Sequence, residues 1–377
     1  MGSFVNPGNQ AFLDAINEDI YIDKSLLISY VNQRIGKRRK YLCVSRPRRF
    51  GKSIAADMLT AYYSRGCDSS KVFNRLKIAD DGTYQTHLNQ YDVIHIDVQW
   101  FRVYAQKPEN TVPLLQKEII SELQTIYPEC VHQEDTFLPM VLSRINTKAG
   151  KQFVIIIDEW DSLIREDKDN EPVIEDYLNL LRGLFKGVQP SAFIKLAYIT
   201  GILPILKYDT QSSLNEFHEF TMLDPDELAE FVGFTETEVI DLCEQYHQDF
   251  NEVKRWYDGY LFSKLHIYNP KAIVSVMPRG RFKSYWSKTG SYESLQKYIA
   301  MNFDGLRDRI IEMLAGGRCA IDTETFQNKL TDLKSRDDVM TLLIHLGYLA
   351  YDEYRGEAYI PNEEIRGEFL RATRTNE

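Results

Sequence analysis

The segment that most constrains the fold of this chain is Ser45–Ser53, which reads SRPRRFGKS. It lies between a short apolar run, Tyr41–Ser45 (YLCVS), and a stretch with helical character, Ile54–Arg65. A strand that passes through a glycine-containing loop into a helix is the setting of a phosphate-binding loop. Gly51 lets the backbone approach a phosphate, and the free N–H groups at the start of the helix attract the anion. The segment therefore predicts a P-loop.

The end of this segment carries the residues that a P-loop uses for chemistry. Lys52 is expected to reach the β- and γ-phosphates of a nucleotide, and the Ser53 hydroxyl is expected to hold Mg²⁺. The usual pattern is GxxxxGK[ST], and here Arg46 stands in place of the first glycine. A Gly-Lys-Ser tripeptide arises by chance in on the order of one in five chains of this length. The prediction therefore needs a second element.

That second element is Phe153–Asp161 (FVIIIDEWD), which predicts a buried strand that ends in carboxylates, as in a Walker B motif. Asp158 is expected to hold Mg²⁺, and Glu159 is expected to polarise the attacking water. An acidic turn after a core strand is the common alternative. Thr200, at the end of another apolar run, is a candidate sensor of the γ-phosphate, with a simple Thr-Gly turn as the alternative. Both motifs follow strands in the expected order, which predicts a nucleotide site.

Short apolar runs alternate with amphipathic stretches through the first half of the chain, which predicts an α/β structure with a largely parallel sheet. The other expected strands are Val93–Val98, Ile194–Ile199 and His218–Leu223. The other expected helices are Thr111–Tyr127 and the stretch from Pro172 to Lys186. We assign residues 1–223 to this core.

The pattern changes after Leu223. A helix is expected to start at Asp224-Pro225, and Thr235 with Glu238 predicts a capping box at the start of the next one. The expected elements of the last part are a helix over Leu306–Ala315, two further helical stretches, and a hairpin formed by Tyr348–Tyr351 and Ala358–Ile360. Residues 224–300 are predicted to form a helical lid and residues 301–377 a winged-helix domain.

Charge and cysteine content narrow the function. The 377 residues carry a net charge of −10, yet eight basic residues and no acidic one lie between Lys37 and Lys52. Nucleic acid or an anionic membrane is therefore not expected to bind the whole surface, whereas a local anion site is expected. The five cysteines are scattered without a CxxC spacing, so a zinc knuckle or a disulfide framework is not expected. With no secretory signal and no long apolar run, we predict a cytoplasmic protein.

Several motifs together resemble a bacterial family usually called AAA-ATPase-like. Those already quoted are the P-loop segment and IDEWD. The further matches are Tyr21–Ser25 (YIDKS), Ile199–Gly201 (ITG), Gly233–Glu238 (GFTETE), Tyr257–Phe262 (YDGYLF), Tyr268–Pro270 (YNP), Tyr285–Gly290 (YWSKTG) and Ile360–Glu364 (IPNEE). The resemblance covers nearly the whole chain, and the family itself carries arginine in place of the first glycine. It implies a P-loop NTPase core of the additional-strand (AAA/STAND-like) type, a helical lid and a C-terminal winged helix.

The resemblance also implies ATP and Mg²⁺ as cofactors and a set of site residues. The residues implied around the nucleotide are Arg46, Pro47, Arg48, Arg49, Phe50, Gly51, Lys52, Ser53 and Ile54, with Tyr21 and Asp23 near the base or ribose. Ser53 and Asp158 would hold the metal, and Lys52, Glu159 and Thr200 would act in catalysis. Asp161 would either order the loop after Walker B or cap the following turn, and we favour the cap. Arg165, Arg182 and Lys186 follow Walker B, and none is assigned as an arginine finger, which a neighbouring subunit could also supply.

These observations favour an ATPase that acts as a conformational switch, binding ATP and releasing ADP. The alternative is a nucleotide-gated interaction module with negligible turnover, acting on an effector such as the PD-(D/E)XK nuclease-like domain of relatives, or as a homo-oligomer. DNA binding is a further alternative, although the stretch 337–346 is apolar and acidic and resembles a core helix. A kinase is less favoured, because the Asp158-Glu159 pair followed by Thr200 suits hydrolysis. We find no arrangement typical of the nuclease-like domain and expect no membrane partner.

Overall fold

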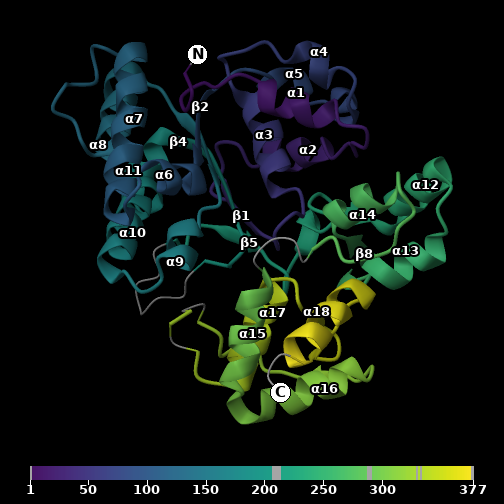
Figure 1. The fold of residues 1–377 in the computed structure, drawn as a ribbon. Helices are drawn as coiled ribbons and strands as arrows, with labels where there is room; N and C mark the ends of the chain where they lie inside the picture. The colour runs from purple at the N-terminus through teal and green to yellow at the C-terminus, as the bar shows by residue number, and fades with distance from the viewer. Residues whose placement is uncertain (1, 206–213, 287–290, 328–329, 332, 375–377) are drawn as a thin grey trace. The chain divides into compact units, whose positions relative to one another are not determined.

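The computed structural model describes the chain except for residues 1, 206–213, 287–290, 328–329, 332 and 375–377. It divides into two compact units (Figure 1). The N-terminal unit comprises Met1–Val44 and Lys52–Glu219, and the C-terminal unit comprises Ser45–Gly51 and Phe220–Glu377. None of the helices in the described part of the chain is long and apolar enough to cross a membrane. The predicted core, residues 1–223, differs from the N-terminal unit by residues 45–51 and 220–223, and the division into core, lid and winged helix stays a prediction.

A five-stranded sheet forms the centre of the N-terminal unit, in the order β2-β3-β4-β1-β5. Its strands are β1 (Tyr41–Ser45), β2 (Asp92–Asp97), β3 (Phe153–Asp158), β4 (Ile194–Gly201) and β5 (His218–Phe220). Strand β3 pairs in parallel with both β2 and β4. Strand β4 lies between the P-loop strand β1 and the Walker B strand β3, which is the extra strand for which the additional-strand class is named. The predicted α/β fold class is therefore confirmed.

The central strands were predictable because both of their faces are covered. Every residue of β1 and β3 is buried, as expected for Val- and Ile-rich strands inside a parallel sheet. Figure 1 shows α7, α8, α10 and α11 gathered on one side of the sheet. These helices are α7 (Thr111–Ile126), α8 (Leu138–Ala149), α10 (Glu171–Phe185) and α11 (Val188–Phe193). Their apolar faces form one buried core with β2, β3 and β4.

The helix α3 (Lys52–Tyr63) follows the P-loop and packs against β2, β3 and β4. The remaining α-helices of the N-terminal unit are α1 (Gln10–Ile16), α2 (Leu26–Asn32), α4 (Ser70–Phe73), α5 (Tyr84–His87), α6 (Val98–Tyr104) and α9 (Ser162–Glu166). Its 3₁₀ helices are Lys77–Asp80 and Pro108–Asn110. The predicted helices over 54–65, 111–127 and 172–186 thus correspond to α3, α7 and α10.

The first part of the C-terminal unit is less helical than predicted. The helices are α12 (Glu236–Tyr246), α13 (Phe250–Tyr257), α14 (Pro270–Val276) and α15 (Ser291–Met301). They accompany an antiparallel sheet of β6 (Phe234–Thr235), β8 (Leu265–Tyr268) and β7 (Tyr260–Phe262). The predicted capping box is confirmed, because Thr235 and Glu238 exchange both hydrogen bonds. The helix expected at Asp224-Pro225 is only a 3₁₀ turn, Asp226–Leu228.

The second part of this unit contains the predicted hairpin, whose strands β10 (Ala350–Asp352) and β11 (Glu357–Tyr359) pair antiparallel, with β9 (Cys319–Ala320) beside β11. Its helices are the 3₁₀ helix Phe303–Gly305, α16 (Leu306–Leu314), α17 (Arg336–His345) and the unpredicted α18 (Glu363–Arg374). Residues 338–345 of α17 are all buried, as expected for a core helix. The other predicted helical stretch lies partly outside the described residues. The winged-helix assignment stays a prediction.

Candidate functional site

The predicted metal ligand Asp158 and the predicted catalytic residues Lys52, Glu159 and Thr200 lie together in the N-terminal unit. Asp158 ends β3, Thr200 lies near the end of β4, and Lys52 begins α3. The Thr200 hydroxyl donates a hydrogen bond to the Asp158 carboxylate, and Lys52 Nζ lies 3.9 Å from Glu159 Oε1. Because the carboxyl ends of parallel strands meet at one edge of a sheet, these residues, far apart in sequence, form one polar cluster.

The electrostatics of this cluster are those of charges removed from water. Burial lowers the pKa of Lys52, and the nearby carboxylates of Glu159 and Asp158 oppose that shift. Burial likewise raises the pKa of Glu159, and the Lys52 ammonium opposes it. Glu159 also has a left-handed backbone, with φ at 51°, which is uncommon outside glycine and clusters at functional sites. The cluster therefore has the perturbed groups and backbone strain that are typical of an active centre.

Arg165 binds two of the acidic residues that follow β3. Its Nη2 lies 2.5 Å from Glu159 Oε2, and its Nε lies 2.8 Å from Asp161 Oδ2. The side chain is 8% exposed, and the Asp161 side chain is completely buried. Of the cations considered for an arginine finger, Arg165 is thus part of the cluster, whereas Arg182 pairs with Glu175 on the surface of α10. No arginine finger is assigned.

Asp161 does not cap the following helix, so the favoured prediction for this residue is wrong. It occupies the N-cap position of α9, but its side chain makes no capping hydrogen bond. Instead, Oδ2 accepts the backbone N–H groups of Ile202 at 3.1 Å and Leu203 at 2.9 Å. Asp161 therefore ties the turn after Walker B to the loop after β4, which is the alternative role that the sequence left open.

Two further carboxylates near Asp158 were missed. Asp97 ends β2 and stands opposite Asp158 in the parallel register, and Asp57 lies one helical turn after Ser53 in α3. Burial, followed by the charges of Asp158 and Asp97, raises the pKa of Asp57 to about 7. Asp97 lies inside the expected strand Val93–Val98, and its carboxylate caps α6 by accepting the N–H of Trp100. Ser53 and Asp57 are four residues apart on one helix face, and this spacing could have indicated that Asp57 lies near the predicted metal ligand Ser53.

The P-loop segment Ser45–Gly51 belongs to the C-terminal unit, and Arg46 lies completely buried there. Its Nη1 donates to the carbonyl oxygens of Phe220 at 3.0 Å and Thr221 at 2.8 Å. Its guanidinium also lies 4.8 Å from the centre of the Phe262 ring. In this structure Arg46 holds backbone carbonyls and an aromatic ring, so its predicted contact with a phosphate stays a prediction.

The rest of the loop is held by the same unit. Arg49 Nη1 donates to the Tyr285 carbonyl at 3.1 Å, and the buried Phe50 packs edge-to-face on Tyr260. A methyl group on Gly347 would lie 2.8 Å from Pro47, so the loop and this glycine are in close contact. The other loop residues are Arg48, which is exposed and whose carbonyl accepts from Asn269, and Gly51, which has a φ of 92°. That positive φ is readily adopted only by glycine.

The remaining predicted site residues are exposed or contact residues outside the polar cluster. Ser53 and Ile54 are exposed in the first turn of α3. Tyr21 packs edge-to-face on Phe12, and burial together with the Asp23 charge raises its pKa. The Asp23 carboxylate accepts the backbone N–H groups of Ser25 and Lys77, so it shapes its own loop. The contacts of Tyr21 and Asp23 with a base or ribose stay predictions.

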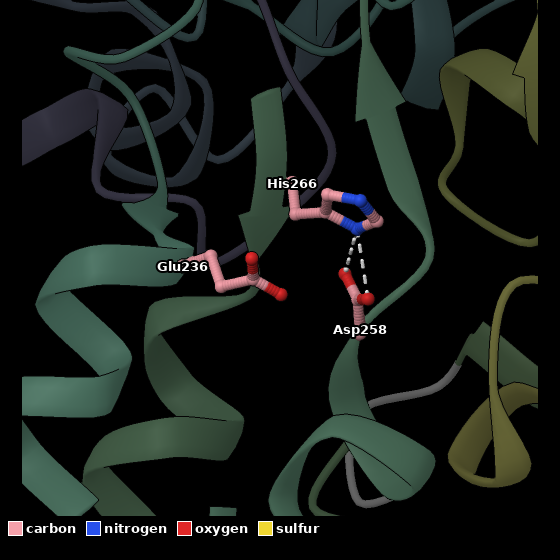
Figure 2. A group of neighbouring side chains, drawn as sticks. All are labelled: Glu236, Asp258 and His266. Atoms are coloured by element: carbon pink, nitrogen blue, oxygen red, sulfur yellow. Dashed lines mark hydrogen bonds and ion pairs between the residues drawn. The ribbon is translucent and has the colours of Figure 1, made fainter. Parts of the chain in front are cut away.

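A second cluster of ligand-type side chains lies in the C-terminal unit. Figure 2 shows Glu236, Asp258 and His266 pointing toward one another, and His266 Nδ1 lies 2.9 Å from Asp258 Oδ2. The ammonium of Lys254 pairs with Glu236 and lies 3.8 Å from Asp258. Lys254 therefore supplies the positive charge that these carboxylates require. We interpret the cluster as an ion-pair network that ties α12, α13 and β8 together.

Comparisons with known proteins place these observations in context. An uncharacterized protein from the vnfD 5′ region of Azotobacter chroococcum mcd 1 is 25% identical over 281 residues, which are 72% of this chain and 51% of that protein. The chain thus spans about half the length of this curated relative.

Two solved structures are similar at a low level. PCH-2 of C. elegans has a TM-score of 0.29 and 11% identity, with 97% of this chain and 73% of that chain covered. The ORC2 protein of Aeropyrum pernix, solved in ADPNP and ADP complexes, has a TM-score of 0.40 and 12% identity, with 98% of both chains covered. Such scores carry no weight for fold or function.

The family comparison is stronger. A family model described as AAA-ATPase-like, predicted AAA-ATPase, matches residues 7–211. The match covers more than half of the chain and contains the P-loop, the Walker B strand and Thr200. The chain therefore belongs to the AAA-ATPase-like family.

Proposed function

We propose that this chain binds ATP with Mg²⁺ and hydrolyses it, and that the reaction drives a conformational switch. The observation that carries the proposal is the polar cluster of Lys52, Asp158, Glu159 and Thr200 at the carboxyl ends of neighbouring strands. A buried ammonium at the start of a helix after a P-loop is suited to the negative charge of a nucleotide phosphate. The switch role is supported by the segment Ser45–Gly51, which belongs to the C-terminal unit, because phosphate bound by this segment would act on that unit.

The residues near Asp158 fit a magnesium ion. Mg²⁺ prefers oxygen ligands, and the hydroxyl of Ser53 and the carboxylate of Asp158 would hold it, with Asp57 and Asp97 close enough to add negative charge. When bound, the metal supplies positive charge that stabilises the transferring phosphoryl group. Its charge would also favour the ionised form of the Asp57 carboxyl group.

The chain's own residues have distinct roles in this proposal. Lys52 binds phosphate oxygens, and Thr200 holds Asp158 in place through its hydroxyl. Glu159 orients the attacking water and accepts its proton at a carboxylate oxygen. For this step Glu159 must be ionised and must face the water.

The pairing of Glu159 with Arg165 favours a second candidate, a nucleotide-gated module with very slow turnover. In this structure the Glu159 carboxylate accepts a hydrogen bond from Arg165, and a carboxylate held by a guanidinium is a weaker base. Rapid turnover therefore requires Glu159 to exchange Arg165 for water. If that exchange does not occur, the chain binds ATP and acts through binding alone, on an effector or on another copy of itself.

Mg²⁺-dependent ATP hydrolysis by the full chain separates the two candidates. The wild type is compared with Glu159→Gln, with Lys52→Ala, and with Glu175→Gln, which changes an exposed acid on α10. An ATPase loses turnover in the first two variants and in EDTA, whereas the control variant retains it. Tight ATP binding without turnover in the wild type, lost in Lys52→Ala, identifies the gated module. A wild type that neither binds nor hydrolyses ATP contradicts both.

A further inference from the structure

One backbone segment of the C-terminal unit links the P-loop to the helix α18. The carboxylate of Glu364 accepts the N–H groups of Tyr285, at 2.5 Å, and Trp286, at 2.9 Å. On its other side, the Tyr285 carbonyl accepts a hydrogen bond from Arg49 Nη1 at 3.1 Å. Tyr285 is thus held through its N–H group by α18 and through its carbonyl by the P-loop.

The hydrogen bond from Arg49 to Tyr285 affects the backbone conformation of the loop. Its backbone has a φ of 70°, so the loop takes a left-handed conformation at a residue that is not glycine. That conformation is unfavourable for a residue with a side chain and persists only where surrounding contacts fix it. The hydrogen bond to Tyr285 is one of those contacts. Gly51, two residues later, also has a positive φ, so the loop backbone between Arg49 and Lys52 depends on how Arg49 is held.

Glu364 is buried among groups that affect its charge. Burial raises its pKa to about 7, the backbone N–H groups of Tyr285 and Trp286 and the Arg49 guanidinium oppose that shift, and Glu368 adds to it. Among the described residues, the phenols of Tyr257, Tyr260 and Tyr285 also interact with Glu364, and burial raises their own pKa values. These phenols stay neutral near pH 7, so Glu364 is the group whose charge changes there.

We propose that Glu364 is a positioning residue for the nucleotide loop, acting through the Tyr285 backbone on Arg49, so that the affinity of the P-loop for ATP depends on the Glu364 carboxylate. The proposal rests on the nucleotide-binding function proposed above. The ionised carboxylate holds the Tyr285 and Trp286 N–H groups and attracts the Arg49 guanidinium, which keeps the loop in its binding conformation before ATP arrives. The protonated acid holds both more weakly, and the loop then has more conformational freedom to lose on binding.

Equilibrium binding of Mg·ATP to the full chain at pH 6 and pH 8 tests this proposal. Glu364→Gln keeps the shape and one acceptor oxygen of the side chain but removes its charge, and we expect its Kd at pH 8 to be roughly tenfold weaker than that of the wild type. At pH 6 the difference shrinks to about twofold or less, because wild-type Glu364 is then mostly protonated. Glu363→Gln, an exposed neighbour on α18, is expected to bind as the wild type does at both pH values.

A double-mutant cycle with Arg49→Met shows whether Glu364 acts through Arg49. In that background Glu364→Gln is expected to weaken ATP binding by less than about twofold further, because the link is already broken. A purely structural role for Glu364 predicts the same loss in both backgrounds and no dependence on pH, and either result overturns the proposal. Equal affinities of wild type and Glu364→Gln also overturn it while leaving ATP binding intact. Failure of the wild type to bind ATP overturns the proposed function and this inference together.

Discussion

In the loop Ser45–Gly51, basic side chains hold backbone carbonyls, whereas in the cluster after β3 they pair with carboxylates. Arg46 and Arg49 donate to carbonyls of the C-terminal unit, while Lys52 and Arg165 lie against Glu159. A hydrogen bond to a neutral carbonyl orients the guanidinium of an arginine, whereas a carboxylate also balances its positive charge. The loop arginines therefore shape a backbone, and the cations of the cluster set the electrostatics of the proposed active centre.

The loop and the cluster are expected to respond differently when a nucleotide binds. A loop shaped by contacts in the C-terminal unit changes its conformation when those contacts change. In a cluster of paired charges, the charge pairing changes mainly when a charged ligand binds. The proposed switch depends on the first property and the proposed hydrolysis on the second.

Among the variants considered, Arg165→Met is expected to lower the free energy of unfolding most. The substitution leaves the fully buried Asp161 and the partly buried Glu159 without this cation, and breaking a buried ion pair costs about 4 kcal/mol. Urea unfolding measures the loss in the free energy of unfolding. Arg182→Met removes a surface pair whose side chains are 29% and 58% exposed, and it is expected to cost about 0.5 kcal/mol or less. A small loss for Arg165→Met would show that the cluster does not depend on charge pairing.

Arg46→Met is expected to cause the second-largest loss in the free energy of unfolding. Its carbonyl partners, including those of Phe220 and Thr221, lose a buried donor, which is expected to cost about 3 kcal/mol. Arg48→Met, in the same loop but exposed, is the matched control and is expected to stay within about 0.5 kcal/mol of the wild type. Thermal unfolding in parallel with urea unfolding gives both values. Equal losses in the two variants would contradict an anchoring role specific to Arg46.

The free energy of unfolding is expected to change by about 3 kcal/mol as Glu364 titrates, since one pKa unit corresponds to about 1.4 kcal/mol. Burial raises its pKa from 4.5 to about 7, so the folded chain binds the proton more tightly than the unfolded chain. Its contribution is fully present below about pH 4.5 and is lost as the pH rises through 7. Glu364→Gln is therefore expected to lose this part of the pH dependence and to be more stable than the wild type at pH 8. Unfolding profiles of both proteins that stay parallel from pH 5 to pH 8 would contradict the assignment.

The smallest effect is expected for Gly201→Ala. An added methyl group would lie 2.6 Å from atoms of the Trp160 ring and 2.8 Å from Asp161 Oδ1, so the turn after Walker B has to shift. Crowding minus the gain from a stiffer unfolded chain leaves a cost of about 1 kcal/mol. Gly82→Ala meets no atom within 4 Å and is expected to be neutral or slightly stabilising. A neutral Gly201→Ala would show that this turn can make room for a methyl group.

The sheet could be predicted from the sequence because its central strands are buried on both faces. Tyr41–Ser45 and Phe153–Asp158 are continuous apolar runs, and no other element of this length suits them in an alternating α/β pattern. The antiparallel sheet of β6, β7 and β8 was missed because its strands have only two to four residues. The helix α18 was missed as well.

For the candidate site, local sequence patterns predicted residues that lie together in the structure, but not the contacts that hold them. Lys52, Asp158 and Thr200 were identified because each follows a recognisable strand. The buried state of Arg46 depends on carbonyls at residues 220 and 221, and the role of Asp161 depends on N–H groups at residues 202 and 203. Neither partner is visible in the local pattern. A sequence motif therefore located the nucleotide loop but not what holds its shape.

Calorimetric titration of Mg·ATP into the full chain, beside Lys52→Ala, tests the central claim most directly. We predict one ATP bound per chain in the wild type and a Kd at least about tenfold weaker in the variant, since a charge-assisted phosphate contact contributes roughly 1.5–3 kcal/mol. No binding to the wild type, or the same affinity in both proteins, would contradict a nucleotide site built on this loop and its lysine.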